Sequence, residues 1–405
     1  MELKPGYKQT ETGGIPEEWN IRSLGDLFSL KHGFAFSSEC FSTNGPIVLT
    51  PGNFRLEGGL YFDDRNTKRY SGNYNSKMIF RKDDLLIVMT DLTPDCNLLG
   101  KPAFVHLEET ILHNQRIGKV VPKSQDIDKA FLFFVLLSPQ YLTRIREMAT
   151  GSTVRHTSNK SIYSILILVP PLCEQRAIAE ALSDVDALIG VLDQLIAKKR
   201  DLKQAAMQQL LTGHTRLPGF TGKWKIKTLQ ETTDCLDNLR VPLNESQREK
   251  MRGDYPYCGA NGILDYVNGY VIDDDIILMA EDGGYFDEYA YRPIAYRMVG
   301  KCWVNNHAHI LKAKQDYDQG FIFYSLVHKN ILNFLASGTR AKLNKSEMEK
   351  IEVLVPMQKN EQTAIAQVLS DMDAEIEALE ARREKTTLLK QGMMQELLTG
   401  KTRLV

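Results

Sequence analysis

The residues best suited to chemistry in this chain are cations, amides and aromatics that gather in polar, glycine-containing stretches. Arginine and lysine bind phosphates and guanine edges, asparagine reads adenine, and aromatic rings stack on bases, so this mixture favours contact with a nucleic acid. The candidate contact residues are Lys68, Arg69, Tyr70, Asn73, Tyr74, Lys77, Arg116, Arg155, His156, Thr157, Asn159, Lys160, Asn261, Tyr285, Asn306, His307, Arg340, Lys342, Asn344 and Lys345. For any one of them, a solvated turn without a partner is an equally good interpretation.

Signatures of catalysis are missing from the sequence. It contains no GxxxxGK[ST] phosphate loop, no glycine loop typical of S-adenosylmethionine sites and no GxSxG nucleophile elbow. His307 and His309 could suggest a metal, but no third ligand is evident, so hydrogen-bonding histidines are favoured. The acidic run at residues 273–275 is predicted to be a turn. We therefore expect neither a catalytic residue nor a metal ligand in this chain.

Length and composition predict an ordinary globular protein. The 405 residues, 43% hydrophobic and 25% charged, suggest two or three domains. No apolar run approaches the ~20 residues that span a bilayer, and the first residues lack the apolar core of an export signal. Six widely spaced cysteines favour reduced thiols in a cytoplasm. The net charge of -1 excludes a uniformly basic polymer binder, although local patches can still bind phosphates.

An internal repeat organises the chain. The stretch EQRAIAEALSDVDALIG, beginning at Glu174, returns as EQTAIAQVLSDMDAEIE, beginning at Glu361, at an offset of 187 residues. The same offset relates QQLLTGHTRL at 208–217 to QELLTGKTRL at 395–404. Weaker matches link Trp19 to Trp224 and the Asn-Lys-Ser runs at 159–161 and 344–346. Between these anchors the halves diverge, so two similar supports carry two dissimilar heads.

Apolar spacing within the repeated segments predicts two helices of ~40 residues, each ~60 Å long. Apolar side chains recur at alternating steps of four and three, the pattern of a coiled-coil seam. The predicted seam residues are Ile178, Leu182, Val185, Ile189, Leu192 and Ile196, and then Ile365, Leu369, Met372, Ile376 and Leu379. The stripe is expected to continue through Leu202, Met207 and Leu210 and through Leu389, Met394 and Leu397. Gly213 and Gly400 stand where each helix should stop.

A helix with one apolar stripe needs a partner, and the other copy is the obvious one. An antiparallel pair would place the two heads at opposite ends of a rod. The alternative is that each helix packs on its own head. Arg383, at the position of Ile196 in the second copy, indicates a more polar seam in that region, and the run Lys198–Arg200 is interpreted as a solvated face. For each head we expect an α+β fold, a small curved mixed sheet with short helices, in which the apolar stretches after Asp84 and Asp275 are buried strands.

In the order of its parts, the chain resembles the specificity subunit of type I restriction-modification systems. The resemblance is carried by the EQxxIAxxLSDxDA helix that ends in LLTGxTRL and follows each head. It predicts a target recognition domain at 1–168, a spacer helix at 169–217, a second recognition domain at 218–354 and a second spacer helix at 355–405. The two helices would form an antiparallel coiled coil with pseudo-twofold symmetry.

The resemblance also implies function. Each head would read one half of a bipartite, asymmetric site in double-stranded DNA, and the coiled coil would set the unread spacer. Two modification subunits would dock on this chain, restriction and translocase subunits would join them, and there would be no membrane partner. No cofactor would bind here, because S-adenosylmethionine, ATP and magnesium would belong to the partners. The alternative from another class is a non-enzymatic coiled-coil adaptor with two protein-binding heads.

Overall fold

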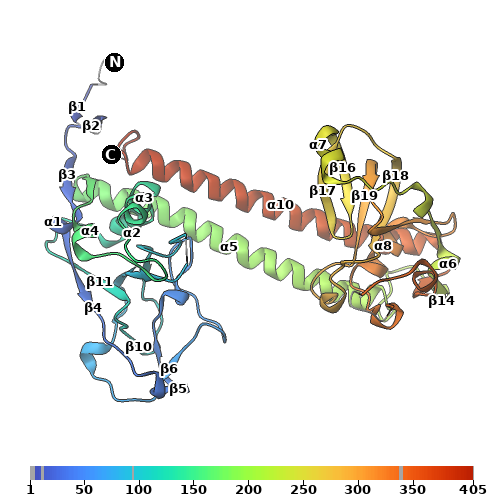
Figure 1. Cartoon of the computed structure of the whole chain (residues 1–405), viewed down its shortest axis with the longest axis horizontal. Helices are drawn as coiled ribbons and strands as arrows, with labels where there is room; N and C mark the ends of the chain where they lie inside the picture. The colour runs from blue at the N-terminus through green and yellow to red at the C-terminus, as the bar shows by residue number, and fades with distance from the viewer. Residues whose placement is uncertain (1–4, 11–12, 94, 337–340, 405) are drawn as a thin grey trace. The chain divides into compact units, whose positions relative to one another are not determined.

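The structure is a computed structural model that describes residues 5–10, 13–93, 95–336 and 341–404. The chain divides into two compact units, and each unit takes part of both long helices (Figure 1). Unit 1 comprises residues 1–191 and 383–405, and unit 2 comprises residues 192–382. Among the described residues, no helix is both long and apolar enough to cross a membrane. All six cysteines are free thiols.

Unit 1 contains a mixed α/β head. Its four-stranded antiparallel sheet has the order β4 (Phe28–His32), β11 (Ile117–Pro122), β7 (Leu85–Val88) and β9 (Pro102–Phe104). A second, mixed sheet has the order β10 (Ile111–Leu112), β5 (Phe41–Val48) and β6 (Arg69–Tyr70). The short strands β8 (Thr90–Asp91) and β12 (Arg155–His156) pair with each other, as do β1 (Tyr7–Thr10) and β2 (Gly13–Pro16). The helices are α1 (Leu24–Leu27), α2 (Lys129–Leu137), α3 (Pro139–Glu147) and α4 (Asn159–Tyr163).

Unit 2 contains the second head, built on one six-stranded mixed sheet. The strand order is β15 (Thr233–Cys235), β20 (Ala308–Ala313), β18 (Ile272–Ala280), β19 (Ala295–Val304), β16 (Arg252–Gly259) and β17 (Gly262–Val267). Its helices are α6 (Leu229–Thr232), α7 (Glu245–Lys250), α8 (Gln319–Val327) and α9 (Lys345–Met348). Both heads therefore confirm the predicted α+β class, and the central strands β7 and β18 are buried as expected.

The acidic run is where the turn prediction was wrong. Asp273, Asp274 and Asp275 lie inside β18, in register with Lys301, Gly300 and Val299 of β19. Ion pairs neutralise two of these carboxylates on the sheet, since Asp274 pairs with Lys312 at 2.5 Å and Asp275 pairs with Arg297 at 2.6 Å. Cross-strand cations let acidic residues occupy a strand that the residue types alone disfavour.

A small two-stranded sheet frames each head at the base of its long helix. β3 (Asn20–Ser23) pairs with β13 (Leu166–Val169) in unit 1, and β14 (Trp224–Thr228) pairs with β21 (Glu352–Pro356) in unit 2. Each pair joins the start of a head to the strand that leads into a long helix. Of the weaker sequence matches of the repeat, Trp19 directly precedes β3 and Trp224 opens β14, whereas the Asn-Lys-Ser runs lie in α4 and at the start of α9.

The long helices are α5 (Leu172–Leu210) and α10 (Lys359–Leu397), each of 39 residues. Gly213 and Gly400 adopt the left-handed conformation, with φ of +69° and +71°, as is typical of residues just beyond a helix end. In unit 1 the start of α5 and the end of α10 enter one core with the head, through Ile178, Leu182 and Leu397 (Figure 1). In unit 2 the end of α5 and the start of α10 do the same. Each helix thus packs both on its own head and on the other helix, in antiparallel order within each unit.

The predicted seam residues are all buried or half-buried, but the predicted continuation of the stripe is wrong at two positions. Leu202 and Leu389 are 47% and 57% exposed. The seam continues instead through Lys203 and Lys390, one residue further along each helix, because both ammonium groups find a carboxylate across the seam. Lys390 pairs with Asp186 at 2.5 Å in unit 1, and Lys203 pairs with Asp373 in unit 2. The repeat offset relates one pair to the other, so each unit has the same partly exposed polar contact.

The Glu-Gln pair that opens each repeated segment has a structural role. Glu174, whose side chain is fully buried, accepts hydrogen bonds at 2.8 and 2.9 Å from Arg403 of the other LLTGxTRL segment. Glu361 is bound in the same way by Arg216, at 2.9 and 2.6 Å. Residues 198–200 form the solvated face that was expected, since Lys198 and Arg200 are exposed, and Lys199 and Arg200 pair there with acidic residues of α10.

The glutamine of each Glu-Gln pair forms a hydrogen bond with a head. Gln175 accepts a hydrogen bond from the backbone N–H of Asp128 at 2.9 Å, and Gln362 accepts one from the N–H of Asp318 at 2.8 Å. Asp128 and Asp318 are the N-caps of α2 and α8, the helices that hold the aromatic runs of the two heads. The repeated motif therefore fixes how each long helix meets its head.

Candidate nucleic-acid interface

In each head a polar loop attaches to the end of the buried central strand. Residues 155–156 of the first head form β12, which pairs with β8 directly after β7, and the N–H of Thr157 donates to the carbonyl of Met89 at 3.1 Å. In the second head, Lys342 forms a β-bridge with Asp282, directly after β18. The two loops, matched in sequence only by their glycine, cations and Asn-Lys-Ser run, therefore hold equivalent places in the two folds.

Several predicted contacts of the first head converge around this strand end. The carbonyl of Arg116 accepts a hydrogen bond from Met89, at 2.9 Å, and His156 contacts Thr90 at 3.2 Å. Asn159 contacts His32, at the end of β4, at 3.0 Å. His32 was not predicted, because it comes from a strand more than a hundred residues away and no motif surrounds it. Arg116 and Lys160 are exposed and form no ion pair with any described residue.

Two predicted residues of the first head are buried and so cannot meet a ligand directly. Tyr70 is 8% exposed because its ring packs against Phe36 and Phe41, with centroids 4.9 and 6.2 Å away. Thr157 is 7% exposed. The Thr157 hydroxyl and the Nε of Arg155 are buried and find no partner among the described residues. Buried polar atoms without partners are rare in native folds, and a loop that gains a ligand is one explanation for them.

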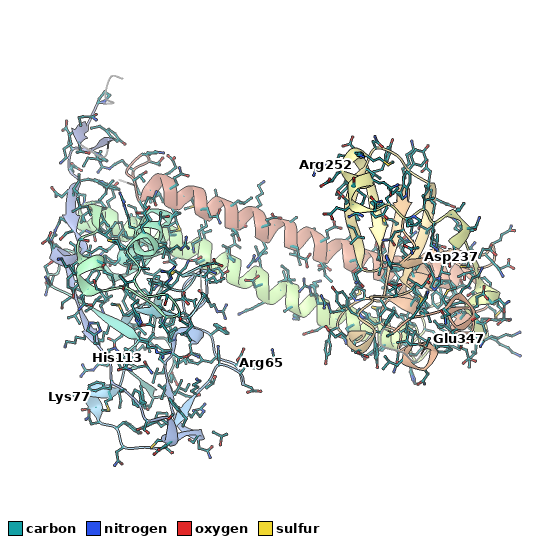
Figure 2. The ribbon with its side chains drawn as sticks, in the orientation of Figure 1. Arg65, Lys77, His113, Asp237, Arg252 and Glu347 are labelled. Carbon is teal, nitrogen blue, oxygen red and sulfur yellow. The ribbon has the colours of Figure 1, made fainter. Side chains whose placement is uncertain are left out.

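The segment from Arg65 to Lys77 does not form a single loop. Figure 2 labels Arg65 and Lys77 on opposite sides of the first head, and β6 runs between them. Arg69 forms an ion pair with Glu109 at 2.9 Å, and the ammonium group of Lys68 lies 5.9 Å from the ring centroid of Phe41. Asn73, Tyr74 and Lys77 remain exposed near residue 78, whose carbonyl binds the backbone of His113. His113 itself is buried, and burial lowers its pKa to about 4, so it adds no charge to this surface.

The polar loops of the second head are joined to one another by hydrogen bonds. Asn261, in the turn between β16 and β17, donates to the carbonyl of Gly283 at 2.9 Å. His307, in the turn before β20, contacts Asp282 at 2.8 Å. Tyr285 lies under the guanidinium of Arg292, 3.3 Å from the ring centroid. Asn306, Asn344 and Lys345 are exposed beside these loops, whereas Arg340 lies outside the described residues.

Acidic groups neutralise several cations of the second head, a feature that the sequence did not predict. Glu281 pairs with Lys342 at 2.9 Å and with Arg240. Burial raises the pKa of Glu281, but hydrogen bonds from Arg240 and Lys342 outweigh it and hold the pKa below its usual value. These residues are separated by 41 to 61 positions in the chain, so only the fold brings them together. The second head is therefore a preorganised polar surface rather than a strongly positive one.

The family model described as type I restriction modification DNA specificity domain matches residues 16–198 and 221–388. The chain belongs to this family. A putative type I restriction enzyme specificity subunit of Haemophilus influenzae is 35% identical over 159 residues, which cover 39% of this chain and 39% of that relative. The chain thus matches about two fifths of the length of that curated relative.

Two further similarities extend over nearly the whole chain. The putative MjaX specificity subunit of Methanocaldococcus jannaschii is 24% identical over an alignment of 435 positions, covering 98% of this chain and 96% of the relative. The crystal structure of the S subunit from M. genitalium aligns with a TM-score of 0.65 at 17% identity, covering 98% of this chain and 99% of that one. This second similarity concerns the fold. The resemblance that the repeated helices indicated is therefore confirmed at the level of the family.

Proposed function

We propose that this chain is the specificity subunit of a type I restriction-modification complex in a bacterial or archaeal cytoplasm. Each head would read one half of a bipartite, asymmetric site in double-stranded DNA. The observation that carries the proposal is the contrast between the repeated and the divergent parts. The helices, the Glu–Arg ion pairs and the framing strands recur, whereas the loops at the ends of β7 and β18 carry different side chains. A duplicated support with two different reading surfaces is what an asymmetric target requires.

The spacing of the half-sites would come from the helices. Heads that are held about one turn of B-DNA apart, ~34 Å, can both reach the major groove from one face. Helices of 39 residues are long enough to keep two domains at such a separation. The bases between the half-sites would then be crossed without being read.

Methylation and cleavage of DNA would be carried out by partner subunits. We infer that two modification subunits dock on this chain and supply the S-adenosylmethionine site, and that restriction subunits supply the use of ATP and magnesium. A stoichiometry of two is supported by a surface groove that recurs at equivalent positions of the two units. The groove of unit 1, about 650 Å³, has Leu398 and Leu168 in its wall, and that of unit 2, about 390 Å³, has Leu211 and Leu354.

Methylome profiling tests the proposal most directly. Deleting the gene should abolish adenine methylation at one bipartite motif in the host genome, and complementation should restore it. The motif would also give the target sequence of each head. A methylome that is unchanged by the deletion would reject the assignment.

A binding measurement tests the division of labour. Because the chain has a net charge of -1, the isolated subunit should bind the target weakly and with a shallow dependence on salt. The assembled complex should bind tightly. Equal affinities of the isolated chain and the complex would contradict the proposed need for partner subunits.

A further inference from the structure

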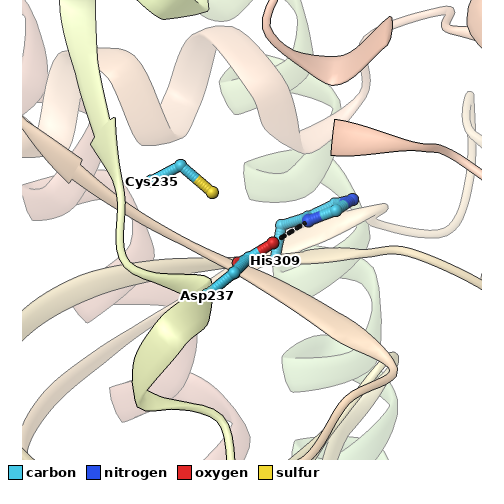
Figure 3. Close-up of side chains that lie close together, drawn as sticks. All are labelled: Cys235, Asp237 and His309. Carbon is cyan, nitrogen blue, oxygen red and sulfur yellow. Dashed lines mark hydrogen bonds and ion pairs between the residues drawn. The ribbon is translucent and has the colours of Figure 1, made fainter. Parts of the chain in front are cut away.

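A buried histidine lies beneath the reading loops of the second head. His309, in β20, is 1% exposed, and Figure 3 shows its ring directed at Asp237 with Cys235 nearby. Asp237 opens a short turn of 3-10 helix at residues 237–239, just after β15. The mechanism proposed above assigns no role to this group.

The hydrogen bonds of His309 define its charge. Nδ1 lies 2.7 Å from the carboxylate of Asp237, and Nε2 lies 2.8 Å from the carbonyl oxygen of Leu343. A carbonyl accepts only, so Nε2 must carry a proton, and an ionised carboxylate likewise requires a proton on Nδ1. Both nitrogens therefore donate, and the ring is an imidazolium cation. Burial lowers the pKa of His309, but its bonds to Asp237, Cys235 and Leu343 outweigh burial and raise the pKa to about 9.

The groups around the ring balance this charge. Asp237 faces it from the 3-10 turn, where Ile310 N–H and Arg240 also bind the carboxylate at 3.0 and 3.3 Å. Glu281 faces it from the end of β18 at 3.8 Å. Burial opposes ionisation of Asp237, but hydrogen bonds from His309 and the Ile310 N–H outweigh it and lower the pKa. Lys342, bound to Glu281, and the Cys235 thiol are the further titratable groups that the described residues place near the ring.

A metal site is the competing interpretation, since ligand atoms of Cys235, Asp237 and His309 lie within 4.8 Å of one another. Both ring nitrogens of His309 are already committed to acceptors, and the second oxygen of Asp237 accepts from Ile310. A zinc ion would have to displace at least one of these bonds and would find three ligands among the described residues. The hydrogen-bonding geometry therefore favours protons over a metal at this position.

The loop held by His309 carries predicted contact residues. Both backbone polar groups of Leu343 are hydrogen-bonded: its carbonyl accepts from His309, and its N–H donates to the carbonyl of Glu281 at 2.7 Å. Leu343 is fully buried, whereas Lys342 and Asn344 on either side of it are exposed. Anchoring the middle residue inward fixes the outward position of its neighbours.

We propose that His309 is a positioning residue for sequence recognition by the second head: as a buried imidazolium it holds the loop at 341–345 in the shape that meets DNA. The inference rests on the proposed function. At the equivalent place beside the central strand of the first head, β11 carries Ile117 instead of a histidine. The device would therefore affect only one of the two half-sites.

Affinity as a function of pH tests this role in the assembled complex, with a duplex that carries the motif found by methylome profiling. In the wild-type protein His309 should stay protonated from pH 6.0 to 8.5, so it should cause no change in DNA affinity over this range. Asp237→Asn removes the carboxylate, so the histidine should titrate nearer its ordinary pKa of about 6.5. The variant should bind well at pH 6.0 and lose roughly tenfold in affinity by pH 8.5, because the neutral ring still donates to Leu343 from Nε2 but without charge assistance.

The matched control is Asp84→Asn in the first head. Asp84 is also a carboxylate beside a central strand, but it forms its ion pair with Lys119, at 2.6 Å, and not with a histidine. Asp84→Asn should show no added pH dependence. Substituting bases of the second half-site should remove the pH effect of Asp237→Asn along with specific binding, whereas bases of the spacer should not matter.

Each outcome has a distinct meaning. If wild type fails to discriminate its motif at any pH, the proposed function is wrong. If wild type discriminates and Asp237→Asn follows it at every pH, the role of His309 is wrong. Should Asp237→Asn fail to fold, nitrogen-15 spectra of histidine-labelled wild-type chain decide instead: both His309 nitrogens should be protonated at pH 8, and a neutral tautomer refutes the inference. Tightly held zinc in the purified complex, with binding lost on chelation, would also refute it.

Discussion

The repeat offers an internal comparison between two ion pairs with a fully buried glutamate, of which one also receives a hydrogen bond from an indole. Glu174 is bound by Arg403 and also by the indole N–H of Trp19 at 2.9 Å. Glu361 is bound by Arg216, but the indole nitrogen of Trp224 is buried without a partner among the described residues. Replacing each arginine by methionine should therefore have unequal effects.

The expected loss of stability in each variant depends on the buried glutamate that remains. Removing one partner of a buried ion pair costs about 3–5 kcal/mol, because the other charge is left uncompensated. Arg216→Met leaves the fully buried Glu361 in this state, so unit 2 should lose stability by that amount. In Arg403→Met the Trp19 N–H still binds Glu174, and a hydrogen bond to a charged group contributes about 1.5–3 kcal/mol. Arg403→Met should therefore destabilise unit 1 less than Arg216→Met destabilises unit 2. At ~2–4 °C per kcal/mol, Arg216→Met should lower the Tm of its unit by about 6–20 °C.

Hydrogen exchange measured by mass spectrometry is the appropriate assay, because two units need not unfold together. Peptides from β14 and β21 report on unit 2, and peptides from β3 and β13 report on unit 1. Arg216→Met should speed exchange in the first set only. Adding Glu361→Met to it should restore most of the protection, since no charge then remains buried.

Two results would refute this reasoning. One is that Arg403→Met proves as costly as Arg216→Met, which would mean that Trp19 does not sustain Glu174. The other is a double variant no more stable than Arg216→Met alone, which would mean that the arginine acts by packing and not by compensating a charge.

Three other predictions concern the helices and the buried histidine. Lys203→Asp should destabilise unit 2 by about 1 kcal/mol, since the pair is partly exposed, and adding Asp373→Lys should recover this loss in thermal unfolding. Inserting seven residues into both α5 and α10 should lengthen the unread spacer by ~10 Å, about three base pairs, in the methylated motif, and an unchanged motif would contradict the spacing role. His309 has a folded pKa of about 9 against 6.5 for the free group, so its stabilisation is present below pH 6.5 and is lost as pH rises through 9. The stability difference between wild type and His309→Gln should therefore shrink over that range, by on the order of 3 kcal/mol.

The sequence by itself determined the repeat, the two long helices, the mixed α/β class of the heads and the family. These depend on local periodicity and on motifs that recur at a fixed offset, and both are visible in one dimension. The prediction of the seam was wrong only at Leu202 and Leu389, where Lys203 and Lys390 occupy the seam instead. A lysine is tolerated in a seam only when a carboxylate faces it. That condition depends on the partner helix, not on the local pattern.

Only the tertiary structure decided which polar residues form a surface and which support it. Tyr70 is polar enough to contact a base, yet the fold buries it between two phenylalanines. The contacts of His309 with Asp237 and Leu343 join three segments that are 72 and 34 residues apart. Loop side chains acquire their roles through such long-range contacts. Their residue types indicated what could be bound, but the position and charge of each group depend on neighbours that only folding supplies.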